Sequence, residues 1–180
     1  QNCISKLHFE DCVIYMIDHE KKVLVQKAAY GPKSFGKLKI RNPITINIGQ
    51  GIVGTVAKTG IAEIVADTAH DPRYIRDDAQ RFSELAVPIV YEEQVLGVID
   101  SEHSQKNFFN ERHLQILTTI AKLCANKISR AMIDEKIHSI DLEISEMKRH
   151  VAEAKLSALR AQMSPHFVFN TCLFKKKRIF

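Results

Sequence analysis

The second half of the chain contains the feature that most limits its fold, a long run without glycine or proline. Neither residue occurs from Glu111 to Met163, and Pro165 follows shortly after. Because glycine and proline disfavour a helix interior most strongly, this run favours one continuous helix. Asn110 stands directly before it, where a side-chain oxygen can accept a hydrogen bond from the first turn, so we expect the helix to begin at Glu111.

Apolar residues in the later part of this run repeat at the spacing of a coiled coil. They are separated alternately by four and three positions over about four heptads, and they are Ile133, Ile137, Ile140, Ile144, Met147, Val151, Ala154, Ala158 and Ala161. Lys136 and Asp141 flank this heptad seam with opposite charges, as a parallel pair of helices requires. Glu143 and Lys148 do the same one heptad later. The sequence therefore predicts a homodimer through a coiled coil over residues 129–161.

The apolar residues before the heptad seam follow a different phase. They are Leu117, Ile120, Cys124, Ile128 and Ala131. Joining them to the seam requires a phase slip between residues 125 and 133, which would locally unwind a coiled coil. We therefore expect residues 112–128 to pack on their own domain and only the later residues to dimerise.

The first half of the chain carries the patterns of β-strands. The run CVIYMID is almost continuously apolar, which is typical of a central strand. Two pairs of such runs are separated by short polar turns, as in hairpins. Pro88 cannot donate a ladder hydrogen bond, so it must lie at an edge or a bulge. The predicted strands are 12–18, 22–30, 44–48, 85–91 and 94–103.

A glycine-rich stretch, GQGIVG at residues 49–54, matches the G-x-G-x-x-G pattern of dinucleotide-binding turns. That function needs a buried strand before the turn and a long helix after it. Here ITINI (44–48) alternates like a half-exposed strand, and the helix predicted at 52–58 ends after about two turns. The glycines instead predict a sharp strand-to-helix turn, close packing at Gly54 and a helix cap at Gly60.

Several motifs between residues 47 and 128 occur in a recognisable order. They are the glycine turn, VADTAHDPRY, SELAVPI, VLGVID and a closing amphipathic helix. As a set they resemble a GAF domain over about residues 10–128. The resemblance implies an α+β fold, in which a six-stranded antiparallel sheet is flanked by helices. It also implies a small-molecule pocket and a sensory role. The predicted domain is 1–128, with an incomplete helix at its start because Gln1 looks like the inside of a helix.

The resemblance also indicates where a ligand would lie, without identifying it. In the family, the segment that contains Asp67, Asp71, Arg73 and Tyr74 borders the pocket, so these four are candidate ligand-binding residues. Loop hydrogen bonds and turn formation are the alternative role for them. The stretch QKNFFNERH lacks the acidic pair of cyclic-nucleotide-binding relatives, and the chain has no Cys-His pair of the kind that binds bilins. The ligand stays unknown.

The stretch LSALRAQMSPHFVFN (156–170) resembles the phosphoacceptor motif of the LytS/YehU family of sensor histidine kinases. The match implies that His166 accepts a phosphoryl group and that Asn170, one helical turn later, assists it. A neutral imidazole is a good nucleophile near pH 7. Pro165 can kink the helix, so the coiled coil is predicted to relay a change in the GAF domain to His166.

After Asn170 the chain departs from the kinase pattern. The ending TCLFKKKRIF contains no ATP-binding box, so we expect this segment (156–180) to lack kinase activity alone. Its phosphoryl group would come from a kinase domain in trans and pass to a response regulator. A truncated gene, a frameshift and a cloning scar all explain the abrupt ending.

Charge and composition indicate which partners, compartment and cofactors to expect. The formal net charge is +5, but four positive charges are consecutive at residues 175–178, so the rest is nearly neutral and predicts no nucleic-acid partner. Four scattered cysteines predict a reduced, cytoplasmic protein. No apolar run is long enough to span a bilayer, so a membrane would be reached only through an upstream part. The histidines show no metal-ligand spacing, so no metal is expected.

Two alternatives to the kinase role stay open. One is a non-enzymatic regulatory dimer whose pocket binds a small metabolite. The other is a GAF-type methionine sulfoxide reductase that would use the cysteines.

Overall fold

The computed structural model describes residues 7–34, 40, 42–77 and 79–162 of the 180-residue chain. The chain divides into two compact units, residues 1–130 and residues 131–180. The first unit contains the sheet and its covering helices, and the second contains the later part of the long helix.

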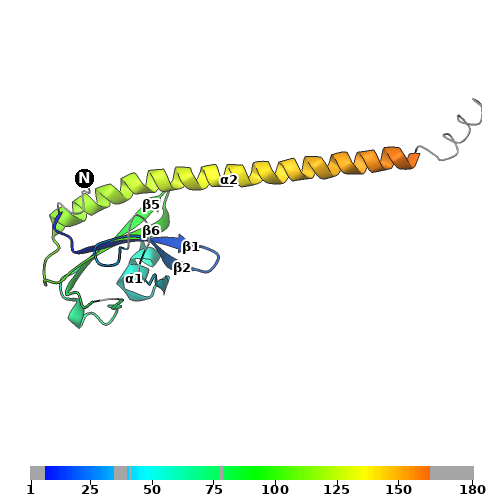
Figure 1. Ribbon diagram of the computed structural model, residues 1–180. Helices are drawn as coiled ribbons and strands as arrows, with labels where there is room; N and C mark the ends of the chain where they lie inside the picture. The colour runs from blue at the N-terminus through cyan, green and yellow to red at the C-terminus, as the bar shows by residue number, and fades with distance from the viewer. Residues whose placement is uncertain (1–6, 35–39, 41, 78, 163–180) are drawn as a thin grey trace, which may run out of the picture. The chain divides into compact units, whose positions relative to one another are not determined.

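Within the described residues, six strands form one antiparallel sheet in the order β3-β2-β1-β6-β5-β4 (Figure 1). This arrangement confirms the predicted α+β fold. The strand β4 was not predicted, because the residues around it (61–66, IAEIVA) do not alternate between apolar and polar. The strands are β1 (Asp11–Asp18), β2 (Val23–Tyr30), β3 (Thr45–Asn47), β4 (Glu63–Val65), β5 (Ser83–Tyr91) and β6 (Gln94–His103).

The pairing of the strands agrees with the sequence patterns. β1 lies between β2 and β6, as its almost continuous apolar run predicted. The pairs β1–β2 and β5–β6 are the two expected hairpins. Pro88 lies beyond Ala86, the last residue of β5 that β4 pairs with, and close to a register irregularity between Ile89 and Val90. Both expectations for this proline, an edge and a bulge, are therefore met.

The glycine stretch forms a turn into α1 (Gly51–Thr59). Gly49 and Gly51 have φ angles of 88° and 72°, in the left-handed region that favours glycine. A Cβ on Gly54 would lie 2.5 Å from the carbonyl oxygen of Asn47, so close packing does require glycine there. Gly60 caps the helix in the left-handed conformation, as predicted.

The long helix α2 (Glu111–Gln162) begins where the sequence predicted. Oδ1 of Asn110 accepts hydrogen bonds from the backbone N–H groups of Arg112 (3.0 Å) and His113 (3.2 Å). These bonds satisfy two donors that the first turn would otherwise leave unpaired.

The sheet carries a separate apolar layer on each face, because side chains alternate along each strand. On one face, Cys12, Leu85 and Ile99 pack with Leu117, Ala121 and Ala125 of α2. On the other, Val13, Val98 and Ala86 pack with residues of α1, including Ile52 and Val56. Figure 1 shows the two helices on opposite sides of the sheet. We call these the α2 face and the α1 face. The expected packing of residues 112–128 on their own domain is confirmed.

In the second unit, the described residues 131–162 are helical, and their heptad seam is exposed to solvent. Its six largest side chains are between 42% and 69% exposed, and they are Ile133, Ile137, Ile140, Ile144, Met147 and Val151. Among the described residues, no helix is both long and apolar enough to cross a membrane.

Candidate ligand site

Charged side chains lie within the α1 face of the sheet, among apolar neighbours. Asp11 of β1, Glu84 of β5, and Asp100 and Glu102 of β6 are each at most 4% exposed. They occupy alternate positions along their strands, next to Val13, Ala86 and Val98, and therefore project from the same face. Charged residues are rarely buried this deeply without partners.

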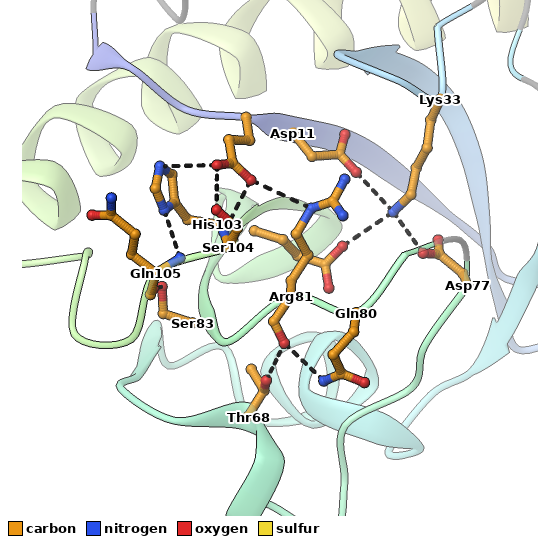
Figure 2. Close-up of polar contacts among 12 residues, drawn as sticks. Asp11, Lys33, Thr68, Asp77, Gln80, Arg81, Ser83, His103, Ser104 and Gln105 are labelled. Atoms are coloured by element: carbon orange, nitrogen blue, oxygen red, sulfur yellow. Dashed lines mark hydrogen bonds and ion pairs between the residues drawn. The ribbon is translucent and has the colours of Figure 1, made fainter.

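One lysine bridges several of these acids. Nζ of Lys33 lies 2.7 Å from Oδ1 of Asp77, 3.0 Å from Oδ2 of Asp11 and 3.2 Å from Oε2 of Glu102. Figure 2 shows the Lys33 ammonium group between Asp11 and Asp77. Burial lowers the pKa of Lys33, but the carboxylates of Glu102 and Asp11 outweigh it and raise the pKa above its usual value. The lysine is therefore charged.

Three acids of the cluster have pKa values raised well above the usual range of a carboxyl group. Burial, with the nearby charge of Glu102, raises the pKa of Glu84 to about 8. Burial and the charges of Glu84 and Glu102 raise the pKa of Asp100 well above its usual value. Burial also raises the pKa of Glu102 to about 7, although Lys33 opposes that shift. Glu84 and Asp100 are hydrogen-bonded to each other, as expected for buried carboxyls that share protons.

A small cavity of about 20 Å³ lies beside these acids, enough for one water-sized group. Polar groups of Asp77, Glu84, Asp100 and Glu102 form part of its wall. Oδ1 of Asp100 has no hydrogen-bond partner among the described residues. The rest of the wall consists of Tyr15, Ile44, Ile46, Gly51, Ile52, Val53 and Ile75.

The glycine turn and one glutamine help to shape this cavity. A Cβ on Gly51 would lie 2.6 Å from Cδ1 of Ile75, so glycine permits the close approach of the wall segment. Nε2 of Gln26 donates hydrogen bonds to the Tyr15 hydroxyl (2.8 Å) and to Oδ2 of Asp77 (3.2 Å). Its Oε1 accepts one from the backbone N–H of Ile44 (3.1 Å). Gln26 of β2 therefore holds three residues of the cavity wall, Tyr15, Ile44 and Asp77.

Of the four predicted pocket residues, Tyr74 is the one hydrogen-bonded to this cluster. Its hydroxyl bonds with Glu102 and also accepts from the backbone N–H of Arg81 at 3.2 Å. Burial raises the pKa of Tyr74 above its usual value, with Glu102 adding to the shift. Tyr74 therefore supports a wall of the site.

The other three line an open depression on the surface. Nη2 of Arg73 lies 2.8 Å from a carboxylate oxygen of Asp71 and 2.8 Å from one of Glu63. Asp67 accepts hydrogen bonds from the backbone N–H of Ala69 (3.1 Å) and from Nζ of Lys106 (2.7 Å). The bond from Lys106 contributes most to lowering the pKa of Asp67, to about 2. These are loop hydrogen bonds, and a ligand contact for the three residues stays a prediction.

His166 and Asn170 lie outside the described residues, so their predicted roles remain predictions. Sequence reasoning missed the acid cluster itself. The signal was present for Glu84, Asp100 and Glu102, because acids at alternate positions of strongly apolar strands must project into a buried face. It was absent for Lys33 and Asp77, which lie outside the described strands and α-helices.

The two described cysteines lie away from the cavity lining. Cys12 is buried on the α2 face and Cys124 belongs to α2. Burial raises the pKa of the Cys12 thiol to about 12, which leaves almost no thiolate at neutral pH. Among the residues with described placement, no group of three or more histidines, cysteines and acids could hold a metal ion.

Comparison with known proteins identifies the class of this domain. The family model described as "GAF domain" matches residues 2–129, so the chain belongs to the GAF domain family. The GAF domain of a phosphoenolpyruvate-protein phosphotransferase from Coxiella burnetii shares the fold, with a TM-score of 0.64 and 20% identity. That match covers 73% of this chain and 78% of the other.

Three curated relatives match shorter stretches. Protein YtsP of Bacillus subtilis is 33% identical over 79 residues, 44% of this chain and 48% of that protein. The free methionine-R-sulfoxide reductase of Saccharomyces cerevisiae is 35% identical over 79 residues, 43% of this chain and 44% of that protein. The sensor protein LytS of Oceanobacillus iheyensis is 32% identical over 87 residues, 48% of this chain and 13% of that protein. The chain thus spans less than half the length of each.

Proposed function

We propose that this GAF domain is the sensing module of a LytS-type sensor histidine kinase. A small molecule binds in the α1-face cavity, and a parallel dimeric coiled coil relays its presence to the phosphoacceptor His166, which Asn170 assists. The module works in the cytoplasm. The phosphoryl group comes from a kinase domain outside these 180 residues, and a response regulator receives it.

The observation that carries this proposal is the exposed heptad seam that leads towards the phosphoacceptor-like motif. Ile137, Ile140 and Ile144 are each more than 40% exposed on a helix with polar neighbours. Exposed apolar stripes of this length are typical of coiled-coil partners. The partial similarity to the LytS sensor protein supports the same assignment.

The phosphoacceptor role is tested by incubating the chain with ATP and an active kinase of the LytS type. We expect acid-labile, alkali-stable phosphate on the chain, and its loss in His166→Gln. His150→Gln is the matched control, because His150 is an exposed histidine of α2. Equal labelling of both variants would contradict the role of His166.

The dimer is tested by light scattering on two matched variants. Ile140→Glu places a charge in the heptad seam and should yield monomers. Leu142→Glu changes a side chain that is 55% exposed but lies off the seam, and it should remain dimeric. A monomeric mass for the unaltered chain would refute the coiled coil.

A second candidate is a non-enzymatic regulatory dimer, in which the cavity binds a metabolite and His166 has no acceptor role. The cluster of buried acids favours this second candidate, because ligand binding in the α1-face cavity would not require the motif at residues 156–170. Absence of phosphate on a well-folded dimer would support this candidate.

The similarity to the yeast free methionine-R-sulfoxide reductase suggests a third candidate, reduction of a sulfoxide. The placement of Cys12 and Cys124 away from the cavity lining argues against it, because a nucleophilic thiolate must reach the substrate. Turnover of free methionine sulfoxide that is lost in Cys12→Ser or Cys124→Ser would revive this candidate.

A further inference from the structure

The α2 face of the sheet is not completely covered by its helix. β4 pairs with β5 only as far as Ala86, and no described strand continues the sheet beside residues 87–90. At this place a groove of about 400 Å³ is lined by β5, by α2 and by the segment that follows α1. Clefts of this volume are typical of small-molecule sites. We call it the α2-face groove.

Most of the groove lining is apolar. Val87 is 1% exposed and belongs to the buried layer of the α2 face, whereas Val90 is 37% exposed. Ala62 and Pro88 complete the apolar side chains of the lining. The groove therefore offers hydrocarbon contacts that reach from the surface to the core, and a ligand with an apolar part would gain free energy by leaving water there.

Two polar side chains line the same groove, and both come from α2. Thr118 and Lys122 are four residues apart, so they lie side by side on one face of the helix. The hydroxyl of the neighbouring Thr119 donates to the carbonyl oxygen of Gln115 at 2.8 Å, whereas that of Thr118 has no hydrogen bond within the described part of the chain. Lys122 forms no ion pair with any described acid. No acidic residue stands three or four positions from it on α2.

We propose that the α2-face groove binds a small aliphatic carboxylic acid in its ionised form. The ammonium group of Lys122 pairs with the ligand carboxylate, and the hydroxyl of Thr118 donates a hydrogen bond to it. The hydrocarbon chain contacts Ala62, Val87 and Pro88. This site is separate from the α1-face cavity and does not depend on the phosphoacceptor role. Binding adds contacts between β5 and α2, the helix that also carries the heptad seam.

Charge and backbone chemistry favour this ligand over other occupants. The lining contains one cation and no acid, so an anionic head group finds a partner and a cationic one does not. An added β-strand is disfavoured, because Pro88 has no N–H to donate and a register irregularity follows it between Ile89 and Val90. A small molecule with one carboxylate and an apolar chain matches both parts of the lining.

The first test uses sodium octanoate and the 180-residue chain, observed by two-dimensional NMR of backbone amides. A ligand of about ten non-hydrogen atoms should bind with a dissociation constant on the order of 1 mM. Amide signals of Ala62, Val87 and Thr118 should shift. Hexanoate, which is two methylenes shorter, should bind about tenfold more weakly. Octylammonium chloride has the same chain with the opposite charge and should bind at least tenfold more weakly.

Two results of this titration would overturn the inference. One is equal affinity for octanoate and octylammonium, because the charge of Lys122 would then have no role. The other is a set of shifts confined to α1-face residues such as Ile52 and Asp100. Groove signals that change with protein concentration but not with octanoate would mean that a second copy of the chain fills the groove, and they would also overturn it.

Matched variants assign the binding to the groove. Lys122→Glu should weaken octanoate binding at least tenfold and strengthen octylammonium binding, and the exposure of Lys122 makes it compatible with folding. Lys127→Glu is the control, because Lys127 is an exposed lysine of the same helix outside the groove lining. Thr118→Val removes the hydroxyl at nearly constant shape and should weaken octanoate binding about threefold. Equal loss in Lys122→Glu and Lys127→Glu would overturn the inference.

Discussion

The two faces of the sheet are built from the same strands, yet they have opposite chemistry. On the α2 face, apolar side chains such as Leu85, Ile99 and Leu117 are fully buried against a helix. On the α1 face, Glu84, Asp100 and Glu102 replace part of that apolar layer. Burying a charged group destabilises the folded state, whereas burying an apolar side chain stabilises it. The comparison indicates that the α2 face stabilises the domain. The α1 face contributes less to stability because it carries the buried acids of the candidate ligand site.

The largest effect should come from removing the charge of Lys33. In Lys33→Met, the carboxyls lose their buried cation, and we expect a loss of about 4 kcal/mol of unfolding free energy at pH 8. At pH 5.5 the loss should be smaller, because Glu102, whose pKa is raised to about 7, is then protonated. Urea unfolding at both values measures it, with the exposed Lys21→Met as the control. A loss that is independent of pH would contradict the charged cluster.

On the α2 face, Leu117→Ala should cost about 3 kcal/mol, because it leaves a cavity at a fully buried position. This loss should be the same at pH 5.5 and pH 8, since no ionisable group is involved. Leu123→Ala is the control on the same helix, where the side chain is 63% exposed. If the loss of unfolding free energy in Leu117→Ala depended strongly on pH, the α2 face would not differ from the α1 face in its dependence on ionisable groups.

Asp100→Asn should stabilise the protein by about 1 kcal/mol at pH 8, and this gain should shrink as the pH falls towards 4. The folded protein holds protons on Glu84, Asp100 and Glu102 that the unfolded chain has released, so stability falls as pH rises from about 4.5 to 8. The amide removes one such group. Thermal unfolding across this pH range checks the sign, and a destabilised variant at pH 8 would mean that Asp100 is ionised and paired.

The smallest effect is expected at Arg73. Like Lys33, it contacts more than one carboxylate, but its side chain is 37% exposed. Arg73→Gln should cost about 0.5 kcal/mol, and salt should screen even that. Urea unfolding at low and high salt measures this loss. A loss as large as that of Lys33→Met would mean that burial is not what separates the two clusters.

Local patterns predicted much of the fold. The start of α2 followed from Asn110 and the run without glycine or proline, and the strand β1 from its apolar residues. The turn into α1 followed from its glycines. Each of these features depends on residues that are neighbours in the chain. The strand β4 was missed because the residues around it show no alternation, whereas those around the equally short β3 do, and because its partner β5 is distant in the sequence.

The sequence by itself determined the start of the long helix, the main strand-forming runs and the heptad seam, because these depend on period and on short-range conformational preference. The α+β class followed from the resemblance of its motifs to GAF domains. Only the tertiary structure decided the site. Asp11, Lys33, Asp77, Glu84 and Asp100 come from distant parts of the chain, and their meeting depends on strand pairing and on which face each side chain occupies. Their charges influence one another only when folding removes the water between them, and no local pattern records that change.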